Sequence, residues 1–142
     1  MADSTTATPE VRPLVKHLTL GPTRDKDFLN GSRCSNCGEL YVGPRLFCAK
    51  CSAAGSFETV RLGSTGQVYV WTIVYQATPY VKAPYIAAVI DLDGGGSVNA
   101  NIVGVEPRPD AMKFGMRVKM STEKVSEDDD GNSYIAYQFQ PA

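Results

Sequence analysis

The second half of the chain is a series of alternating or fully apolar runs separated by turn residues. We expect strands at 57–62, 67–76, 85–92, 97–103, 116–125 and 133–140. Asp93-Gly94-Gly95-Gly96 and Asp129-Asp130-Gly131-Asn132 are typical of tight hairpin turns. No window carries the 3.6-residue period of a long helix. The pattern therefore predicts a small Greek-key barrel of the OB (oligonucleotide/oligosaccharide-binding) type, and a small β-sandwich is the alternative.

The polar pattern changes in the segment before the strands, where a short helix is predicted. Thr23 can cap its first turn, Asp25 and Asp27 would lie in that turn, and Gly31 would end it. The pair Phe28-Leu29 would be its apolar anchor. Because so short a helix is not stable alone in water, it must dock on this protein or on a partner.

All four cysteines of the chain lie in one short window, as two C-x-x-C pairs separated by ten residues. They are Cys34 and Cys37, then Cys48 and Cys51. Each pair closes a tight turn, so that four thiolates can surround one Zn²⁺ tetrahedrally and leave no open coordination position. Such a zinc ion is structural and does not activate water. The alternatives are two disulfides, which need an oxidising compartment, or a redox pair, which needs a single C-x-x-C at a helix start.

These patterns divide the chain into three parts. Residues 1–20 are expected to be a flexible tail, residues 21–56 a short helix and a rubredoxin-like zinc ribbon, and residues 57–142 the OB-fold barrel. The N-terminal residues lack the basic-then-apolar pattern of a signal peptide, and no run approaches the roughly 18 apolar residues of a spanning helix. We therefore expect a cytoplasmic protein with no membrane association.

Composition bears on the function class. The 142 residues are 43% hydrophobic and 20% charged, and 14 basic residues face 15 acidic ones, for a net charge of −1. A dedicated nucleic-acid binder usually carries a basic surplus. A zinc-ribbon/OB module for single-stranded nucleic acid nevertheless stays open, because OB-folds stack bases on exposed aromatic rings. Here the candidate rings are Tyr69, Trp71, Tyr75 and Tyr80.

Strand alternation separates the side chains of residues 67–76 into two faces. Tyr69 and Trp71 fall on one face, and Val68 and Val70 fall on the other. The aliphatic face would suit a barrel interior, which would leave the aromatic face for a ligand or partner, but the reverse assignment is equally open.

The residues needed for catalysis by this chain alone are missing. Zinc would occupy every thiol, so that no cysteine remains as a nucleophile. His17 is the only histidine, and we expect a packed or solvated imidazole. The acidic cluster 127–130 lacks the glycine and glutamate spacing of an EF-hand and is expected to be a solvated hairpin tip.

The order of several motifs resembles a known family. The motifs are Arg33-Cys34-Ser35-Asn36-Cys37-Gly38, Gly43-Pro44-Arg45-Leu46-Phe47-Cys48-Ala49-Lys50-Cys51, Gly66-Gln67-Val68-Tyr69-Val70-Trp71-Thr72, Pro84-Tyr85-Ile86-Ala87-Ala88-Val89-Ile90-Asp91-Leu92 and Gly115-Met116-Arg117-Val118. Over about residues 20–140 the chain is similar to the zinc-ribbon plus OB-fold proteins formerly classed as a domain of unknown function. These proteins are acyl-CoA-associated partners of thiolases.

The resemblance implies a non-catalytic zinc-binding subunit of a thiolase-superfamily enzyme that cleaves or forms a carbon–carbon bond in a β-ketoacyl-CoA. Relatives serve hydroxymethylglutaryl-CoA synthesis in archaea, sterol side-chain degradation, and benzoylsuccinyl-CoA cleavage in anaerobic toluene degradation. The catalytic cysteine and histidines would belong to the partner. Two copies of each chain would form a heterotetramer that follows the two-fold symmetry of a thiolase dimer.

Four cations surround the predicted zinc ribbon and the strand after it: Arg33, Arg45, Lys50 and Arg61. Coenzyme A (CoA) carries phosphates that such side chains could hold, alone or together with the partner. They could also meet acidic groups of the partner, or be ordinary solvated side chains. A stand-alone acyl-CoA-binding protein is therefore a further alternative function.

Overall fold

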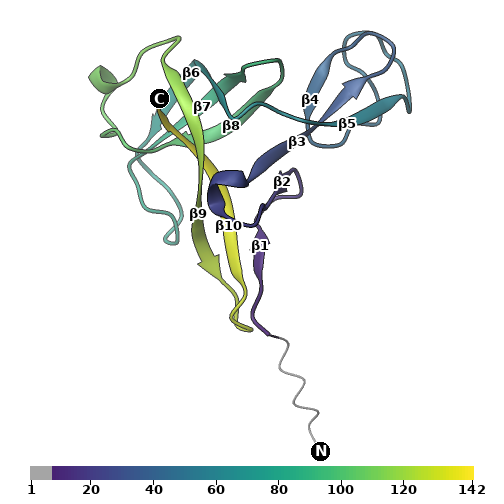
Figure 1. The fold of residues 1–142 in the computed structure, drawn as a ribbon. Coiled ribbons are helices and arrows are strands. Elements are labelled where there is room, and N and C mark those ends of the chain that lie inside the picture. Colours follow the sequence, from purple (N-terminus) through teal and green to yellow (C-terminus); the bar gives the residue numbers. More distant parts are fainter. Residues whose placement is uncertain (1–7) are drawn as a thin grey trace, which may run out of the picture.

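Five strands close into a barrel that forms the larger part of the molecule (Figure 1). The computed structural model describes residues 8–142. The barrel strands are β6 (Thr65–Val74), β7 (Tyr85–Leu92), β8 (Ser97–Ile102), β9 (Arg117–Glu127) and β10 (Ser133–Pro141). They follow the order β6-β7-β8-β10-β9, and β9 returns to β6. Every pairing is antiparallel except the short parallel contact of β10 with β8.

The alternating sequence pattern explains the barrel core. The side chains of Ile90, Val118 and Phe139 are completely buried inside it. Each barrel strand begins and ends within two residues of its predicted limits. The mostly β fold and the OB-type barrel are thus confirmed, with five strands in place of the six expected, and the β-sandwich alternative is wrong. A 3₁₀ turn at Pro109–Ala111 (η2) lies between β8 and β9.

A β-bulge in β6 decides which side chains enter the barrel. Val68 pairs with Ile90, and Val70 pairs with Val89, so that Tyr69 is an extra residue with no partner of its own. The extra residue shifts the alternation by one position. Val68 and Trp71 therefore both point toward the core, while Tyr69 and Val70 are exposed. Neither of the two faces expected from simple alternation survives past the bulge.

A smaller sheet lies beside the barrel at the upper right of Figure 1. It contains β2 (Leu18–Thr19), β3 (Phe28–Cys34), β4 (Leu40–Val42) and β5 (Phe57–Arg61). β3 is its central strand and pairs antiparallel with the other three. β5, which the sequence assigned to the barrel, instead completes this ribbon sheet.

The predicted short helix is wrong. Within residues 8–142 there is no α-helix, and the segment forms only a 3₁₀ turn at Arg24–Lys26 (η1). Phe28 and Leu29 begin β3, where the Leu29 side chain is buried. Asp27, expected in the first turn of this helix, is buried and accepts hydrogen bonds from the N–H of Gly21 at 2.7 Å and the hydroxyl of Thr122 at 2.7 Å. These tertiary contacts outweigh the local signals for a helix.

Much of the segment expected to be a flexible tail is ordered. β1 (Val11–Pro13) runs parallel to β10 and pairs with residues Ser133–Ile135. Figure 1 shows it along the hairpin of β9 and β10, which extends below the barrel. Leu18 belongs to the buried core. The part of the predicted tail at residues 1–7 lies outside the described residues.

The ribbon sheet and the barrel share one hydrophobic core. Leu40, Val42 and Val60 of the ribbon sheet pack against the buried cluster that fills the barrel. Gly95, in the turn between β7 and β8, has a φ of 119°, and a Cβ built there would lie 2.8 Å from Cδ1 of Leu40. A glycine is therefore required where the ribbon meets the barrel.

Candidate metal centre

The two C-x-x-C pairs form turns of the same construction at the tip of the ribbon sheet. The N–H of Gly38 donates to the carbonyl of Cys34 at 2.8 Å, and the N–H of Ser52 donates to the carbonyl of Cys48 at 2.9 Å. The first cysteine of each pair also donates its N–H, at 2.9 Å in both turns, to the carbonyls of Glu39 and Ala53, respectively. Backbone hydrogen bonds therefore orient both cysteine pairs independently of a bound metal.

The four sulfur atoms converge on one point. Sγ of Cys34 lies 3.6 Å from Sγ of Cys51, and Sγ of Cys37 lies 3.5 Å from Sγ of Cys48. All four lie within 4.8 Å of one another. Zn–S bonds of about 2.3 Å in a tetrahedron would place the sulfurs roughly 3.8 Å apart, whereas a disulfide needs about 2.05 Å. The arrangement fits a tetrahedral zinc ion and does not fit disulfides.

Tyr41 supports one of the sulfur ligands, and sequence reasoning missed it. Its hydroxyl oxygen accepts a hydrogen bond from the N–H of Ala49 at 3.0 Å and lies 3.4 Å from Sγ of Cys48. Its own proton can thus be donated to the sulfur. This hydrogen bond is the largest of several contributions, the backbone N–H groups of Cys51 and Lys50 among them, that lower the pKa of Cys48 to about 6. A thiolate is the form that binds metal. An aromatic residue seven positions before the second pair was the available signal.

Two of the four predicted cations rest on aromatic rings. Cζ of Arg45 lies 4.0 Å from the centre of the Tyr41 ring, and Cζ of Arg61 lies 4.4 Å from the centre of the Phe28 ring. The pairing of β3 with β4 and β5 places both rings on the same face of the ribbon sheet. The guanidinium groups therefore cover this face rather than extend freely into solvent.

The other two cations lie elsewhere. Nζ of Lys50 is 3.4 Å from a carboxylate oxygen of Glu39, an exposed ion pair. Arg33, on β3, points to the face opposite that of Asn30 and Phe28. The structure thus does not bring the four predicted cations into one anion site. Arg45 lines a hollow of about 350 Å³ between β4 and Ser97 of β8.

His17 joins the ribbon region to the barrel. Its Nε2 lies 3.2 Å from the hydroxyl of Tyr137, which in turn donates to the carbonyl of Asn99 at 2.9 Å. The hydroxyl must therefore accept from a protonated Nε2. Burial lowers the pKa of His17. The imidazole is packed, in agreement with the expectation from sequence.

The remaining candidate groups do not build a site. Asp128 of the acidic cluster accepts from the backbone and side-chain N–H groups of Asn132, each at 2.9 Å, and from the hydroxyl of Tyr134 at 2.9 Å. Its oxygens close the hairpin, and within residues 8–142 only the cysteines gather as metal ligands. Among the four aromatic candidates, Trp71 packs on the core, whereas Tyr69, Tyr75 and Tyr80 are exposed. No helical segment in residues 8–142 has the length and apolar character needed to span a membrane.

Comparison with known families matches both parts of the structure. Residues 29–58 match the family described as the rubredoxin-like zinc ribbon domain of ChsH2, and residues 59–123 match the C-terminal OB-fold domain of ChsH2. The four cysteines lie in the first of these regions. They are therefore positioned as the ligand set of a zinc ribbon.

Individual relatives support the same assignment. A DUF35 domain-containing scaffold protein of Methanocaldococcus jannaschii is 34% identical over 121 residues, covering 83% of this chain and 84% of that protein. The benzoylsuccinyl-CoA thiolase subunit BbsA of Geobacter metallireducens is 28% identical and covers 80% of this chain and 74% of its own length.

A solved structure, described as an Ltp2-ChsH2(DUF35) aldolase, shares the fold. The match has a TM-score of 0.63 and 28% identity, and covers 80% of this chain and 84% of the solved one. Sequence profiles, relatives and three-dimensional structure agree along most of the described residues. The chain therefore belongs to the ChsH2-type DUF35 family, in which a rubredoxin-like zinc ribbon precedes an OB-fold barrel.

Proposed function

We propose that this chain is a non-catalytic, zinc-binding subunit of a thiolase-superfamily enzyme that cleaves or forms a carbon–carbon bond in a β-ketoacyl-CoA. The observation that carries the proposal is the likeness of ribbon and barrel together to BbsA, named as a thiolase subunit, and to the ChsH2 part of an aldolase complex. BbsA is one subunit of a thiolase, and ChsH2 is combined with Ltp2 in the aldolase.

The chemistry of the site supports this division of labour. Thiolase-type catalysis needs a thiolate nucleophile, a base and an oxyanion hole. In this chain the four thiols converge as metal ligands, and His17 is engaged by Tyr137. The partner supplies the reacting groups. Zinc, when bound to Cys34, Cys37, Cys48 and Cys51, supplies structural cross-linking of the ribbon.

We further propose that CoA is shared between the subunits. Arg45, which lines the hollow between β4 and Ser97, would meet phosphate groups of a CoA held mainly by the partner. One copy of this chain on each protomer of a thiolase dimer gives the heterotetramer. The acyl group is proposed to be bulky, such as an aromatic acyl group in a degradation pathway, by analogy with BbsA.

Co-purification tests the proposal. The tagged chain is co-expressed with each thiolase-superfamily protein of its own genome, and β-ketoacyl-CoA cleavage is assayed for each protein alone and for each complex. We expect one of them to be retained and to be active only in the complex. Cleavage by the purified chain alone, or retention of none of these proteins, would refute the proposal.

Two further measurements separate the alternative functions. Calorimetry with CoA should give no binding to the free chain, and Arg45→Ala should weaken CoA binding by the complex; tight binding by the free chain would favour a stand-alone acyl-CoA protein. Binding of a fluorescent oligonucleotide at two salt concentrations should be weak, whereas tight and steeply salt-dependent binding would favour the nucleic-acid module.

A further inference from the structure

β7 has the composition of a strand that is covered on both faces. Its inward positions, Ile86, Ala88, Ile90 and Leu92, fill the barrel. Its first three outward positions, Tyr85, Ala87 and Val89, are also apolar and are only half-buried; the fourth outward position is Asp91. Antiparallel sheets with one wet face normally alternate apolar and polar residues. A continuous apolar run therefore indicates that the outer face of β7 is covered in the functional protein.

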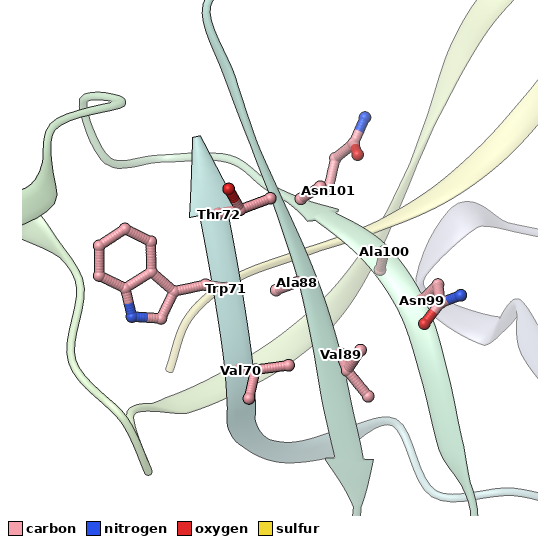
Figure 2. A pocket seen from close by; sticks show the side chains of 9 residues that line it. Val70, Trp71, Thr72, Ala88, Val89, Asn99, Ala100 and Asn101 are labelled. Carbon is pink, nitrogen blue, oxygen red and sulfur yellow. The ribbon is translucent and has the colours of Figure 1, made fainter. Parts of the chain in front are cut away.

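Neighbouring strands extend this outer face sideways. Val70 and Asn99 flank Val89, and Thr72 and Asn101 flank Ala87, in the register of the sheet. Figure 2 shows Val70 and Val89 beside each other, with Asn99 and Asn101 on the β8 side and the Trp71 indole pointing away from them. Together the six outward side chains surround a hollow of about 430 Å³. We name these six residues the outer barrel face.

The chemistry of the outer barrel face favours a polypeptide as its occupant. Among residues 8–142, those that line the hollow carry no charge. Two residues after Val89 on β7, the Asp91 carboxylate accepts a hydrogen bond from the Ser97 hydroxyl at 2.8 Å. A nucleic acid or the phosphates of CoA would need cations at these positions. Valine and alanine with flanking amides instead suit the apolar centre and hydrogen-bonding rim of a protein interface.

Continuity extends the surface to the ribbon. Asn99 and Ser97 both point outward on β8, and Ser97 also lines the hollow that contains Arg45. A stable heteromeric interface takes roughly 800 Å² and about 20–30 residues from each partner, which is more than the six residues of the outer barrel face. The Arg45 hollow is also lined by Glu39, so the joined surface is elongated, uncharged at one end, and carries one cation and one carboxylate at the other.

We infer that the outer barrel face is the surface on which the thiolase-superfamily catalytic subunit docks, with its apolar side chains in the hollow and its edge reaching toward Arg45. This inference rests on the proposed function and adds to it the face of the barrel that makes contact. The catalytic subunit is preferred to a second copy of this chain because the solved relative is described as an Ltp2-ChsH2(DUF35) aldolase, which combines a protein of this family with a different protein.

A pair of matched variants tests the inference. Val70, 43% exposed, lies in the outer barrel face, and Val125, 51% exposed, lies on the β9–β10 hairpin. Val70→Lys and Val125→Lys place the same charge at two strand valines of similar exposure. Zinc content and thermal unfolding report that each variant is folded. Binding is measured to the thiolase-superfamily protein that the wild-type chain retains in co-purification.

We expect Val70→Lys to weaken binding at least tenfold, because the interface would bury the lysine charge with no opposite charge to pair with it. Val125→Lys should bind like the wild type. A photoreactive phenylalanine at position 101 should cross-link to the catalytic subunit, and the same group at position 125 should not. Equal binding by both lysine variants would overturn this inference alone. Retention of no thiolase-superfamily protein by the wild type would overturn the proposed function with it. A wild-type homodimer that Val70→Lys makes monomeric would assign the face to a second copy.

Discussion

Ser52 occupies, in the second cysteine turn, the place that Gly38 occupies in the first. Both residues directly follow the second cysteine of their pair, and both have left-handed backbones, with φ of 64° for Ser52 and 81° for Gly38. Each donates its N–H to the first cysteine's carbonyl. Serine holds this conformation at a cost that glycine does not have.

Replacing Ser52 by glycine should therefore stabilise the ribbon. Relief of the left-handed serine backbone should increase the free energy of unfolding of Ser52→Gly by about 1 kcal/mol. The greater freedom of glycine in the unfolded chain should offset a few tenths of a kcal/mol of this gain. Gly38→Ala is the converse control and should cost about 1 kcal/mol, because open space around Gly38 leaves only the backbone effect. Denaturant unfolding of the zinc-loaded protein measures both. A destabilising Ser52→Gly would show that the two turns are not equivalent.

Zinc removal should affect more than the ribbon tip. Structural zinc contributes on the order of 10 kcal/mol to small zinc lobes, so chelation should expose the amides of residues 35–56 to hydrogen exchange. Because Leu40, Val42 and Val60 pack on the barrel core, the barrel should remain folded but melt several degrees lower. Cys48→Ser should reproduce both effects. An unchanged barrel melting temperature would mean that the two parts are energetically independent.

Removing the Asp27 carboxylate should strongly destabilise the protein. The buried side chain accepts hydrogen bonds from the Gly21 N–H and the Thr122 hydroxyl, and lies 3.4 Å from the guanidinium of Arg24. Asp27→Ala leaves these donors without an acceptor, and we expect a loss of about 2–3 kcal/mol in urea unfolding. Asp25→Ala, a change of an exposed carboxylate on the same turn, should cost less than about 0.5 kcal/mol. Similar losses in both variants would contradict the role given to Asp27.

Acid should weaken the link between β9 and the turn after β7. Both guanidinium nitrogens of Arg117 donate to the Asp93 carboxylate, and with the Thr65 hydroxyl they lower its pKa to about 2. Because the pKa of Asp93 is lower in the folded state than in the unfolded state, where it is near 4, the ionised carboxylate stabilises the folded protein at pH values above about 4. This contribution is lost as the pH falls toward 2. The stability difference between the wild type and Asp93→Asn should therefore shrink from pH 5 to pH 2. A difference that stays constant over this range would exclude the ion pair as its source.

Strand positions and metal ligands were predictable from the sequence because both follow short-range rules. Alternation located the five barrel strands, and the C-x-x-C spacing located the four sulfurs. Long-range partners had no local signal. Thr23, Asp25 and Asp27 resembled a helix start, yet Thr122, almost a hundred residues later, holds Asp27 in an extended segment. Arg33 and Arg61 lie near the cysteines of the ribbon in the sequence, but the register of β3 with β5 points their side chains to opposite faces of the sheet.

The bulge at Tyr69 restricts how this protein can evolve. Loops around a barrel tolerate insertions and deletions, because the change in length stays outside the sheet. At Tyr69 one residue sets the phase of the rest of β6, so that Trp71 enters the core and Val70 joins the outer barrel face. Losing that residue would exchange inside and outside along the strand. Descendants of this chain can therefore carry other residue types at position 69, but they have to conserve the number of residues in β6.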